Sequence, residues 1–400
     1  MAPRTCAAAR LYAPRSAGSS SRWRLAGSVY DGSVLGRTAF WGSLGALAWT
    51  HVGYPALTAA LARTHRRPVR THDIEPSVTF VVAAHDEEAV IEWRLENVLA
   101  LDYPPDSLEI VVVSDASTDA TDAIVASIAA CDDRLRLLRV PRGGKVAAQD
   151  QAVRESGGEI LAFSDANTEW KPDALRKLVR NFADEDVAYV CGSHFYERGD
   201  GTNREGVYAR FEGWLRQNES RFGSITAGVG PIYAVRREDY VELDPRFGHD
   251  LALPYLLVQR GRRAVVEPEA LAWEKPARDI RDEYRRKIRM FEHCWLILLE
   301  GGVLHRLGPL YTLQMVSHRH LRYASGALHV LLLASSATLA PTGRIYRAAL
   351  GAQLAVLGAA TARSGIARYY VLVTWATLPA LRNYLRAGVS PVWEKAEGTR

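Results

Sequence analysis

The segment ILAFSDANTEW, residues 160–170, joins an apolar run to two oxygen-bearing side chains, Asp165 and Asn167. A carboxylate and an amide oxygen are hard ligands of the kind that Mg²⁺ or Mn²⁺ prefers, and these ions complete their coordination with substrate phosphates and water. A single Asp at a strand end is more often a helix cap or a turn residue. The pair therefore indicates a divalent cation only if further polar groups join it.

Three more apolar runs end in polar residues that could join this site, namely His85-Asp86-Glu87, Asp115 and Lys145 after two glycines. Asp115 could accept hydrogen bonds from a ribose hydroxyl or a base N–H, and Lys145 could approach a phosphate. The GGK triplet falls far short of a phosphate-loop motif. No G-x-G-x-x-G follows the first run, so a dinucleotide site is disfavoured.

Between residues 77 and 184 the chain alternates four times between apolar, β-branched runs and helical spacing. The predicted strands are 77–85, 108–115, 134–140 and 159–165, and the predicted helices are 86–101, 117–130, 143–156 and 171–184. Such alternation builds an α/β fold with a mostly parallel sheet flanked by helices. Because ligands bind at the carboxyl ends of parallel strands, we expect the four polar sets to meet at one edge.

Apolar segments flank this charged middle. The hydrophobic fraction of 48% is that of an average soluble protein. Residues 38–62 and 323–342 nevertheless hold almost no charge, and each is long enough to span a bilayer as a helix. Residues 348–362 and 369–381 are shorter and bracketed by arginines, so they fit buried, interfacial or spanning helices alike.

Charge and cysteine content limit the partners. The formal net charge of +5 comes from arginines beside apolar segments, which favours anionic lipid over nucleic acid. Four cysteines without paired spacing predict neither a disulfide framework nor a zinc site. Residues 1–33 are rich in Ala, Arg and Ser, and we interpret them as a disordered tail rather than a transit peptide.

The order of the motifs adds a family resemblance. TFVVAAHDEE, VVVSDASTDAT, GGKVAAQDQAV and ILAFSDANTEWKPDAL resemble successive motifs of the family 2 inverting, membrane-associated glycosyltransferases, which are related to cellulose, chitin and hyaluronan synthases. The resemblance continues through AGVGPIYAVRRE, FGHDLALPYLLVQRGRRAVVEPEALAWE and YRRKIRM, and covers roughly residues 38–396. Each motif alone is modest, whereas their number and order are specific.

The resemblance implies a GT-A fold, a nucleotide-sugar donor, with a UDP-sugar expected, Mg²⁺ or Mn²⁺ as cofactor, and a role for each matching residue. Asp250 matches the general base, and Asp165 with Asn167 matches the metal-binding motif. The nucleotide-sugar site is expected to comprise Ala84, Asp86, Glu87, Asp115, Lys145, Asp165 and Asn167. Contacts with the diphosphate or the acceptor are expected from His249, Arg286 and Arg289.

Some residues depart from the family pattern. His249 stands where Glu or Asp is usual, and Arg286 and Met290 replace the Gln and Trp of the QxxRW motif. Since that motif marks the processive polymerases, the resemblance favours an enzyme that adds a single sugar. The alternative for RRKIRM is a solvated or lipid-facing basic helix face, and the alternative for His249-Asp250 is a plain turn.

Hydropathy and resemblance together predict the organisation of the chain: a disordered basic tail at 1–37, a transmembrane helix at 38–62, a GT-A domain at 70–290, interfacial helices at 291–320, two to three transmembrane helices within 321–385, and a tail at 386–400. Because nucleotide sugars are cytosolic, we expect a multi-pass protein of the cell (inner or plasma) membrane whose catalytic domain faces the cytosol. Arginines at 63–70 agree with the positive-inside rule, whereas arginines before residue 38 oppose it. Gly53 and Pro55 would permit a re-entrant hairpin instead.

The sequence therefore predicts a membrane-bound, metal-assisted glycosyltransferase. Its partners would be a nucleotide sugar, membrane lipids and a polysaccharide, glycolipid or lipid-linked acceptor, without nucleic acid. A non-catalytic relative, acting as a membrane scaffold or nucleotide-sugar sensor in an envelope polysaccharide assembly, is the main alternative. A transporter is disfavoured, because the apolar segments are few and hold no ionisable group beyond His51 and His329.

Overall fold

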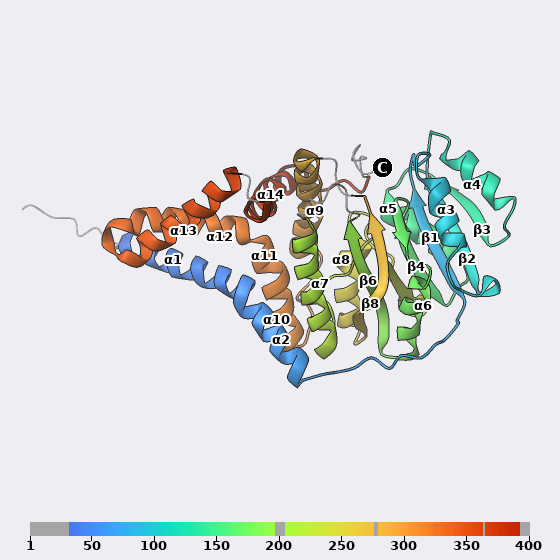
Figure 1. Ribbon diagram of the computed structural model, residues 1–400, viewed down its shortest axis with the longest axis horizontal. Coiled ribbons are helices and arrows are strands. Elements are labelled where there is room, and N and C mark those ends of the chain that lie inside the picture. The colour runs from blue at the N-terminus through green and yellow to red at the C-terminus, as the bar shows by residue number, and fades with distance from the viewer. Residues whose placement is uncertain (1–31, 197–204, 276–278, 363–364, 393–400) are drawn as a thin grey trace, which may run out of the picture.

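The structure is a computed structural model that describes residues 32–196, 205–275, 279–362 and 365–392. The tail expected at 1–37 lies outside the described residues up to residue 31. Figure 1 shows a sheet flanked by helices on one side of the molecule and an arm of helices that extends away from it.

An eight-stranded sheet in the order β3-β2-β1-β4-β7-β6-β8-β5 forms the centre of the described chain. The strands are β1 (Val78–Ala84), β2 (Leu108–Asp115), β3 (Leu135–Val140), β4 (Ile160–Asp165), β5 (Thr168–Trp170), β6 (Val187–Tyr196), β7 (Tyr233–Arg236) and β8 (Arg263–Glu274). The first four strands pair in parallel, as do β6 and β8, whereas β7 and β5 run antiparallel to their neighbours. The predicted α/β class and the four predicted strands are confirmed, within a sheet that is mixed overall.

Both faces of the sheet are apolar because its central strands are continuous runs of buried residues. Phe80, Val81 and Val82 of β1 have no exposed surface, and neither do Val111 and Val112 of β2. Four helices cover these strands, namely α3 (Ile91–Leu99), α4 (Thr121–Ala129), α5 (Lys145–Arg154) and α6 (Ala174–Val179). All four were predicted, but each begins later than expected.

The late start of α3 has a physical cause in its neighbour. Asp86 and Glu87, predicted for the first turn of this helix, instead lie in a turn that binds the loop after β2. The backbone N–H of Thr118 donates to Oδ1 of Asp86 at 2.7 Å, and the N–H of Glu87 donates to Oγ1 of Thr121 at 2.6 Å. Long-range contacts between loops therefore outweigh the preference of acids for a helix start.

Three longer helices complete the wall on the β6 and β8 side. They are α7 (Glu205–Phe222), α8 (His249–Gln259) and α9 (Ile280–Glu300). His249 and Asp250 open α8, so they are not part of a plain turn. The interfacial helices predicted over 291–320 differ in detail: α9 runs through to Glu300, and after a loop come α10 (Pro309–Gln314), a π-helical segment (Met315–His320) and α11 (Leu321–Tyr323).

The arm in Figure 1 consists of N-terminal and C-terminal helices that pack together. They are α1 (Gly32–Ala48), α2 (Tyr54–Thr64), α12 (Ser325–Leu339) and α13 (Arg344–Thr361), while α14 (Gly365–Ala387) lies against α9. Phe40 and Leu47 of α1 form one apolar cluster with Leu332 and Leu339 of α12.

No single described helix is long and apolar enough to cross a membrane. Two bent pairs reach that threshold by length and composition, Pro309–Tyr323 with Ser325–Thr342 at 63° and Arg344–Thr361 with Gly365–Ala387 at 108°. The single helix expected at 38–62 is interrupted by a π-helical turn, Trp49–Gly53. A Cβ on Gly53 would lie 2.7 Å from the Trp49 ring, so the ring occupies the space beside this glycine.

Candidate active site

The carboxyl ends of β2, β1 and β4 lie side by side at one edge of the sheet. Ala84, the last residue of β1, pairs with Ser114 of β2, and its neighbour Ala83 pairs with Asp165 of β4. Asp115 and Asp165 therefore flank the end of β1. This is the convergence that the alternating pattern predicts.

Asp115 is buried and holds the turn that contains the two glycines. Its Oδ1 accepts a hydrogen bond from the N–H of Gly143 at 2.7 Å, and its Oδ2 accepts from the N–H of Gly144 at 3.0 Å. Arg142 adds a charge-assisted hydrogen bond to Oδ2 at 2.5 Å. Asp115 thereby fixes the start of α5, which begins at Lys145.

Gly144 is required by both its backbone and its surroundings. Its φ of 89° and ψ of 166° lie in a region that is essentially restricted to glycine. The chain after α14 returns to the sheet, so that the backbone of Pro391 lies against Gly144 and a Cβ there would overlap its carbonyl oxygen. The C-terminal segment thus covers the turn that Asp115 holds.

Lys145 lies among three acidic side chains. Its ammonium donates a hydrogen bond to Oδ1 of Asp165. Burial would lower the pKa of Lys145, but the charges of Asp165, Asp250 and Glu274 outweigh burial and raise it. Residues from β4, α8 and β8 therefore surround one cation, so the acidic residues predicted for the site are neighbours in space.

Asp250 occupies the first turn of α8, facing the turn after Ala227. A Cβ on Gly230 would lie 3.3 Å from its Oδ2, and the N–H of Gly228 donates to its backbone oxygen at 2.7 Å. Burial raises the pKa of Asp250; Lys145 opposes this shift and Asp165 adds to it. A carboxyl with a raised pKa beside a cavity has the properties of a general base.

His249 points away from Asp250 into the protein. Its side chain is buried, with Nδ1 2.9 Å from Oε1 of Gln149 and Nε2 3.0 Å from the hydroxyl of Tyr240. Tyr240 in turn donates to Oδ1 of Asp150 at 2.5 Å. These contacts tie the start of α8 to α5, and the diphosphate or acceptor contact expected of His249 stays a prediction.

Arg286 and Arg289 lie on α9 beside the ends of β6 and β8. Arg286 forms an ion pair with Glu283 at 2.7 Å and donates to the hydroxyl of Tyr196 at 3.0 Å. Its charge also contributes to the lowered pKa of Glu274, for which burial acts in the opposite sense. Arg289 is half-buried one turn further along and lowers the pKa of His293, mainly a burial effect. Arg286 is thus linked electrostatically to the acidic edge.

The residues around Asp165 fit a divalent cation that is shared with a substrate. Among the described residues, no three His, Cys, Asp or Glu side chains come together as a metal cluster. Asp165 supplies one carboxylate, and Asn167 lines a cavity of about 240 Å³ with Glu169 and Glu274. Mg²⁺ and similar ions are typically held by one or two carboxylates plus phosphate oxygens and water. The Lys145 ammonium against Asp165 shows that positive charge is accommodated here.

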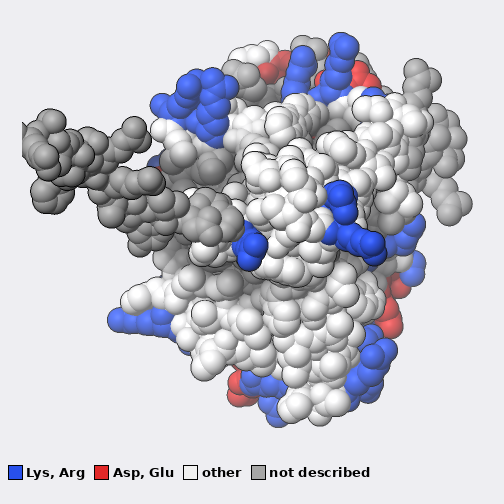
Figure 2. All heavy atoms as spheres, turned by 90° about the vertical axis from the view of Figure 1, so that its left-hand side faces the viewer, with Lys and Arg blue, Asp and Glu red and all other residues white. Residues whose placement is uncertain are grey.

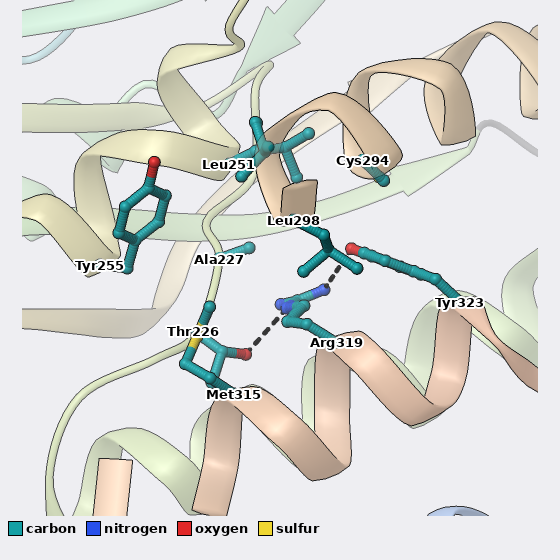
Figure 3. Close-up of a pocket in the computed structure, with 10 residues that line it drawn as sticks. Thr226, Ala227, Leu251, Tyr255, Cys294, Leu298, Met315, Arg319 and Tyr323 are labelled. Atoms are coloured by element: carbon teal, nitrogen blue, oxygen red, sulfur yellow. Dashed lines mark hydrogen bonds between the residues drawn. The ribbon is translucent and has the colours of Figure 1, made fainter. Parts of the chain in front are cut away.

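A cavity of about 480 Å³ opens beside Asp250, between β6, α7 and α9. Arg319 closes part of its wall: Nε donates to Oγ1 of Thr226 at 3.0 Å and NH1 donates to the hydroxyl of Tyr323 at 3.4 Å. Figure 3 shows Arg319 held between these two residues, beneath Leu251 and Leu298. The carboxylate of Asp250 therefore borders a space large enough for part of a second substrate.

Three residues of this region were not singled out from the sequence as site residues. Glu274 is the last residue of β8. A search for polar residues at strand ends would have found it, but β8 was not among the predicted strands. Arg142 directly precedes the double glycine, but its pairing with Asp115 depends on the fold. Arg216 lies on α7, and nothing in the sequence distinguishes it from a solvated arginine.

The fold of the described chain is of the GT-A type. The mannosyltransferase PcManGT from Pyrobaculum calidifontis, solved in complex with GDP-Man and Mn²⁺, matches 88% of this chain and 99% of that chain with a TM-score of 0.68 at 24% sequence identity. The likeness supports the predicted GT-A fold.

Residues 79–243 match the sequence profile of Glycosyl transferase family 2, and this part of the chain is a domain of that family. The chain is 31% identical over 222 residues to the beta-monoglucosyldiacylglycerol synthase of Nostoc sp. (strain PCC 7120 / SAG 25.82 / UTEX 2576). The aligned region covers 52% of this chain and 46% of that protein. It is also 24% identical over 260 residues to the poly-beta-1,6-N-acetyl-D-glucosamine synthase of Staphylococcus aureus (strain COL). That alignment covers 62% of this chain and 63% of the relative. The chain thus spans about half the length of the first of these relatives.

Proposed function

We propose that this protein is a membrane-associated, inverting hexosyltransferase that moves a sugar from a nucleotide sugar to a hydroxyl of a glycolipid, polysaccharide or lipid-linked acceptor. The observation that carries the proposal is the grouping of Asp165, Asp250 and Glu274 around Lys145, at the carboxyl edge of a GT-A sheet. A scaffold or sensor would need the donor pocket but no carboxylate with a raised pKa beside a second cavity.

Asp250 is the proposed general base. In a single displacement the acceptor oxygen forms a bond to the anomeric carbon while the bond from that carbon to the diphosphate breaks, so the configuration inverts. The hydroxyl proton passes to Asp250, whose raised pKa makes it a stronger base than an ordinary aspartate. We assign His249 a positioning role, because its contacts with Gln149 and Tyr240 fix the first turn of α8.

The donor is proposed to lie along the acidic edge. Asp115 with the turn after β1, including Ala84, Asp86 and Glu87, would face the nucleoside, and Lys145 would approach the diphosphate. Asp165 and Asn167 would hold Mg²⁺ or Mn²⁺, which would neutralise charge on the departing diphosphate. Arg286 and Arg289 would stabilise the same charge from α9.

A UDP-sugar is the proposed donor, although the Pyrobaculum neighbour was solved with GDP-Man, and its complex with Mn²⁺ supports metal use. Single addition, rather than processive synthesis, follows from the altered QxxRW motif at Arg286 and Met290.

Membrane association is supported by the surface of the arm. Exposed apolar side chains include Leu35 and Trp41 of α1 and Leu354 and Leu357 of α13. Figure 2 shows this end of the molecule as a broad white surface with Lys and Arg grouped around it and few acids. Apolar surface rimmed by cations is suited to a bilayer with anionic headgroups. We therefore propose attachment to the cell membrane, with the domain of residues 70–290 on the cytosolic side.

A donor panel tests the proposal directly. Purified protein in nonionic detergent or native membranes is expected to consume one or a few members of a set of UDP- and GDP-sugars when Mg²⁺ or Mn²⁺ is present. Chelation with EDTA should reduce turnover at least tenfold, and added metal should restore it. Release of nucleoside diphosphate is the measurement. If no donor in the set is consumed or bound, the scaffold alternative replaces the enzyme.

Replacing Gly144 with Ala is expected to raise KM for the donor about tenfold, because a non-glycine residue in this backbone region costs roughly 1–3 kcal/mol. To relieve that strain, the turn whose N–H groups bind Asp115 would change position. The clash of the new Cβ with the carbonyl oxygen of Pro391 would displace it further. Steady-state KM is the measurement. Gly157→Ala is the matched control, since an added Cβ there meets nothing within 4 Å. A wild-type KM in Gly144→Ala would exclude a role for the turn in donor binding.

A further inference from the structure

The cavity beside Asp250 has an excess of positive charge in its wall. Its lining includes five cationic side chains, Arg210, Arg216, Lys287, Arg319 and Arg322, against two carboxylates, Glu212 and Asp250. A pocket that received only a neutral glycan would need no such excess. Most of these cations already have partners within the protein. What the cavity can bind therefore depends on which cationic side chain still has donors available for a ligand.

The partners of three of the cations are part of the protein. Arg322 pairs with Glu212 at 2.6 Å, Lys287 pairs with Glu283 at 3.3 Å, and Arg319 is held by Thr226 and Tyr323. Arg210 lies on the exposed side of α7. These side chains shape and charge the wall. Arg319 has one buried nitrogen, NH2, without a hydrogen-bond partner, but Thr226 and Tyr323 hold the rest of its guanidinium in place.

Arg216 is different. Within the described chain its guanidinium forms no hydrogen bond or ion pair, and its Nε is buried without a hydrogen-bond partner. Glu212, one turn earlier on α7, feels its charge but is already paired with Arg322 and His318. A buried donor without a partner costs free energy, which an incoming acceptor group would recover. A guanidinium binds phosphate oxygens through two parallel N–H bonds.

Arg216 and Asp250 line the same cavity. The charges of Arg216 and Asp250 both act on Cys191 of β6. Burial raises the pKa of its thiol to about 12, while Arg216 opposes that shift and Asp250 adds to it. Tyr189, on the same strand, likewise feels both Asp250 and Arg216. An anionic group on Arg216 would therefore be carried by the same acceptor molecule whose hydroxyl faces Asp250.

The remaining walls are suited to an amphiphilic molecule. Leu251, Met290, Phe291 and Tyr323 present apolar surface from α8, α9 and α11. Since α11 continues directly into α12 of the arm, the apolar wall leads towards the surface with which we propose that the protein contacts lipid.

We propose that this cavity is the acceptor site and that Arg216 binds a phosphate group of the acceptor, next to the hydroxyl that Asp250 deprotonates. This rests on the proposed glycosyltransferase function and specifies its acceptor as a phosphate-bearing alcohol. The phosphate is a spectator: the hydroxyl oxygen takes the sugar, its proton goes to Asp250, and the nucleoside diphosphate leaves. Either a lipid headgroup or a soluble sugar or polyol phosphate supplies this chemistry.

Three probes distinguish the possibilities with the full chain in nonionic detergent: hexanoyl lysophosphatidic acid, which carries both a phosphate and a free hydroxyl, monohexanoylglycerol and glycerol 3-phosphate. Binding is measured by calorimetry in the presence of UDP. We expect the phosphate-bearing lipid to bind and the neutral lipid to bind at least tenfold more weakly. Glycerol 3-phosphate binding as tightly as the lipid identifies a soluble phosphate as the source, and much weaker binding identifies a lipid phosphate.

Arg216→Gln is expected to weaken binding of the phosphate-bearing probe about 10- to 100-fold, which is the usual effect of a hydrogen bond to a charged group. Arg216→Lys keeps the charge but loses the bidentate geometry of the guanidinium. Its affinity for the phosphate-bearing probe should therefore lie between those of Arg216→Gln and the wild type. Arg221→Gln, on the exposed face of the same helix, is the matched control and should bind as wild type does.

Hydrolysis of the donor by water, which needs no acceptor, is the second readout. It should be unchanged in the Arg221→Gln control and remain measurable in Arg216→Gln, which shows that the latter variant is folded. Three outcomes overturn the acceptor proposal while donor hydrolysis persists: lysophosphatidic acid binds equally to wild type and Arg216→Gln, the neutral lipid binds as tightly as lysophosphatidic acid, or neither phosphate probe binds. Loss of donor hydrolysis in the wild-type protein would instead overturn the proposed function.

Discussion

Asp250→Asn is expected to lower kcat for sugar transfer about 10²- to 10⁴-fold, which is the usual contribution of a general base. The Kd for the nucleotide-sugar donor should remain near that of the wild type, because the amide has the shape of the carboxylate and the donor is bound by other residues. Single-turnover transfer and equilibrium donor binding separate the two effects. Asp244→Asn, an exposed acid shortly before α8 that pairs with Arg246, is the matched control and should keep full activity.

The pH profile gives the same prediction an independent readout. The raised pKa of Asp250 means that it remains protonated, and inactive as a base, at a pH where an ordinary aspartate is ionised. Activity should therefore appear as pH rises through a value above the usual range for Asp, and this acid limb should vanish from the residual rate of Asp250→Asn. Wild-type transfer by the variant, or an acid limb that it retains, would mean that another group takes the proton.

The sheet was predictable because its signal is local. Runs such as VTFVVAA and LEIVVVSD are apolar throughout, and only a strand buried on both faces needs that pattern. The antiparallel strand β7 lies between β4 and β6, although it is distant from β6 in sequence. Pairing of that kind depends on long-range packing, which periodicity does not contain.

The candidate site was predictable in its residue types more than in its contacts. Asp115, Lys145 and Asp165 follow strands or glycines, and the rule about strand ends brings them together. That rule does not say that Asp115 would hold Gly143 and Gly144, or that His249 would turn inward to Gln149. Such contacts join residues on separate elements and exist only once the fold is complete.

Hydropathy was least informative in the apolar segments. Residues 38–62 have the composition of a spanning helix, yet the chain divides there into α1, a π-helical turn and α2. Composition does not reveal that Trp49 fills the space beside Gly53 and donates to Ser317 at 2.8 Å, or that Tyr54 reaches Glu219 on α7. Specific polar contacts with α7 and with the segment Met315–His320 thus accompany the π-helical turn.

Those contacts predict a large effect on stability. The hydroxyl of Tyr54 donates to Oε1 of Glu219 at 2.5 Å, and His318 bridges Glu219 and Glu212, with Nδ1 2.7 Å from the first carboxylate and Nε2 3.2 Å from the second. Glu219 and His318 are fully buried. His318→Ala is expected to lower the free energy of unfolding by about 3–5 kcal/mol, because it breaks a buried polar network and leaves two buried carboxylates without one of their hydrogen-bond partners.

Denaturant unfolding measures that loss, and hydrogen exchange in α2 locates it, since α2 is attached to the catalytic domain through Tyr54. Burial would raise the pKa of Glu219, but His318 and Arg319 outweigh it and hold the pKa below its ordinary value. The stabilisation is therefore present above the ordinary glutamate pKa and is lost as pH falls through the lower, folded-state value. His305→Ala, at an exposed histidine, is the control and should change neither stability nor exchange. If His318→Ala unfolds like the control, the network does not join the arm to the catalytic domain, and apolar packing of α2 against α7 must hold the two together.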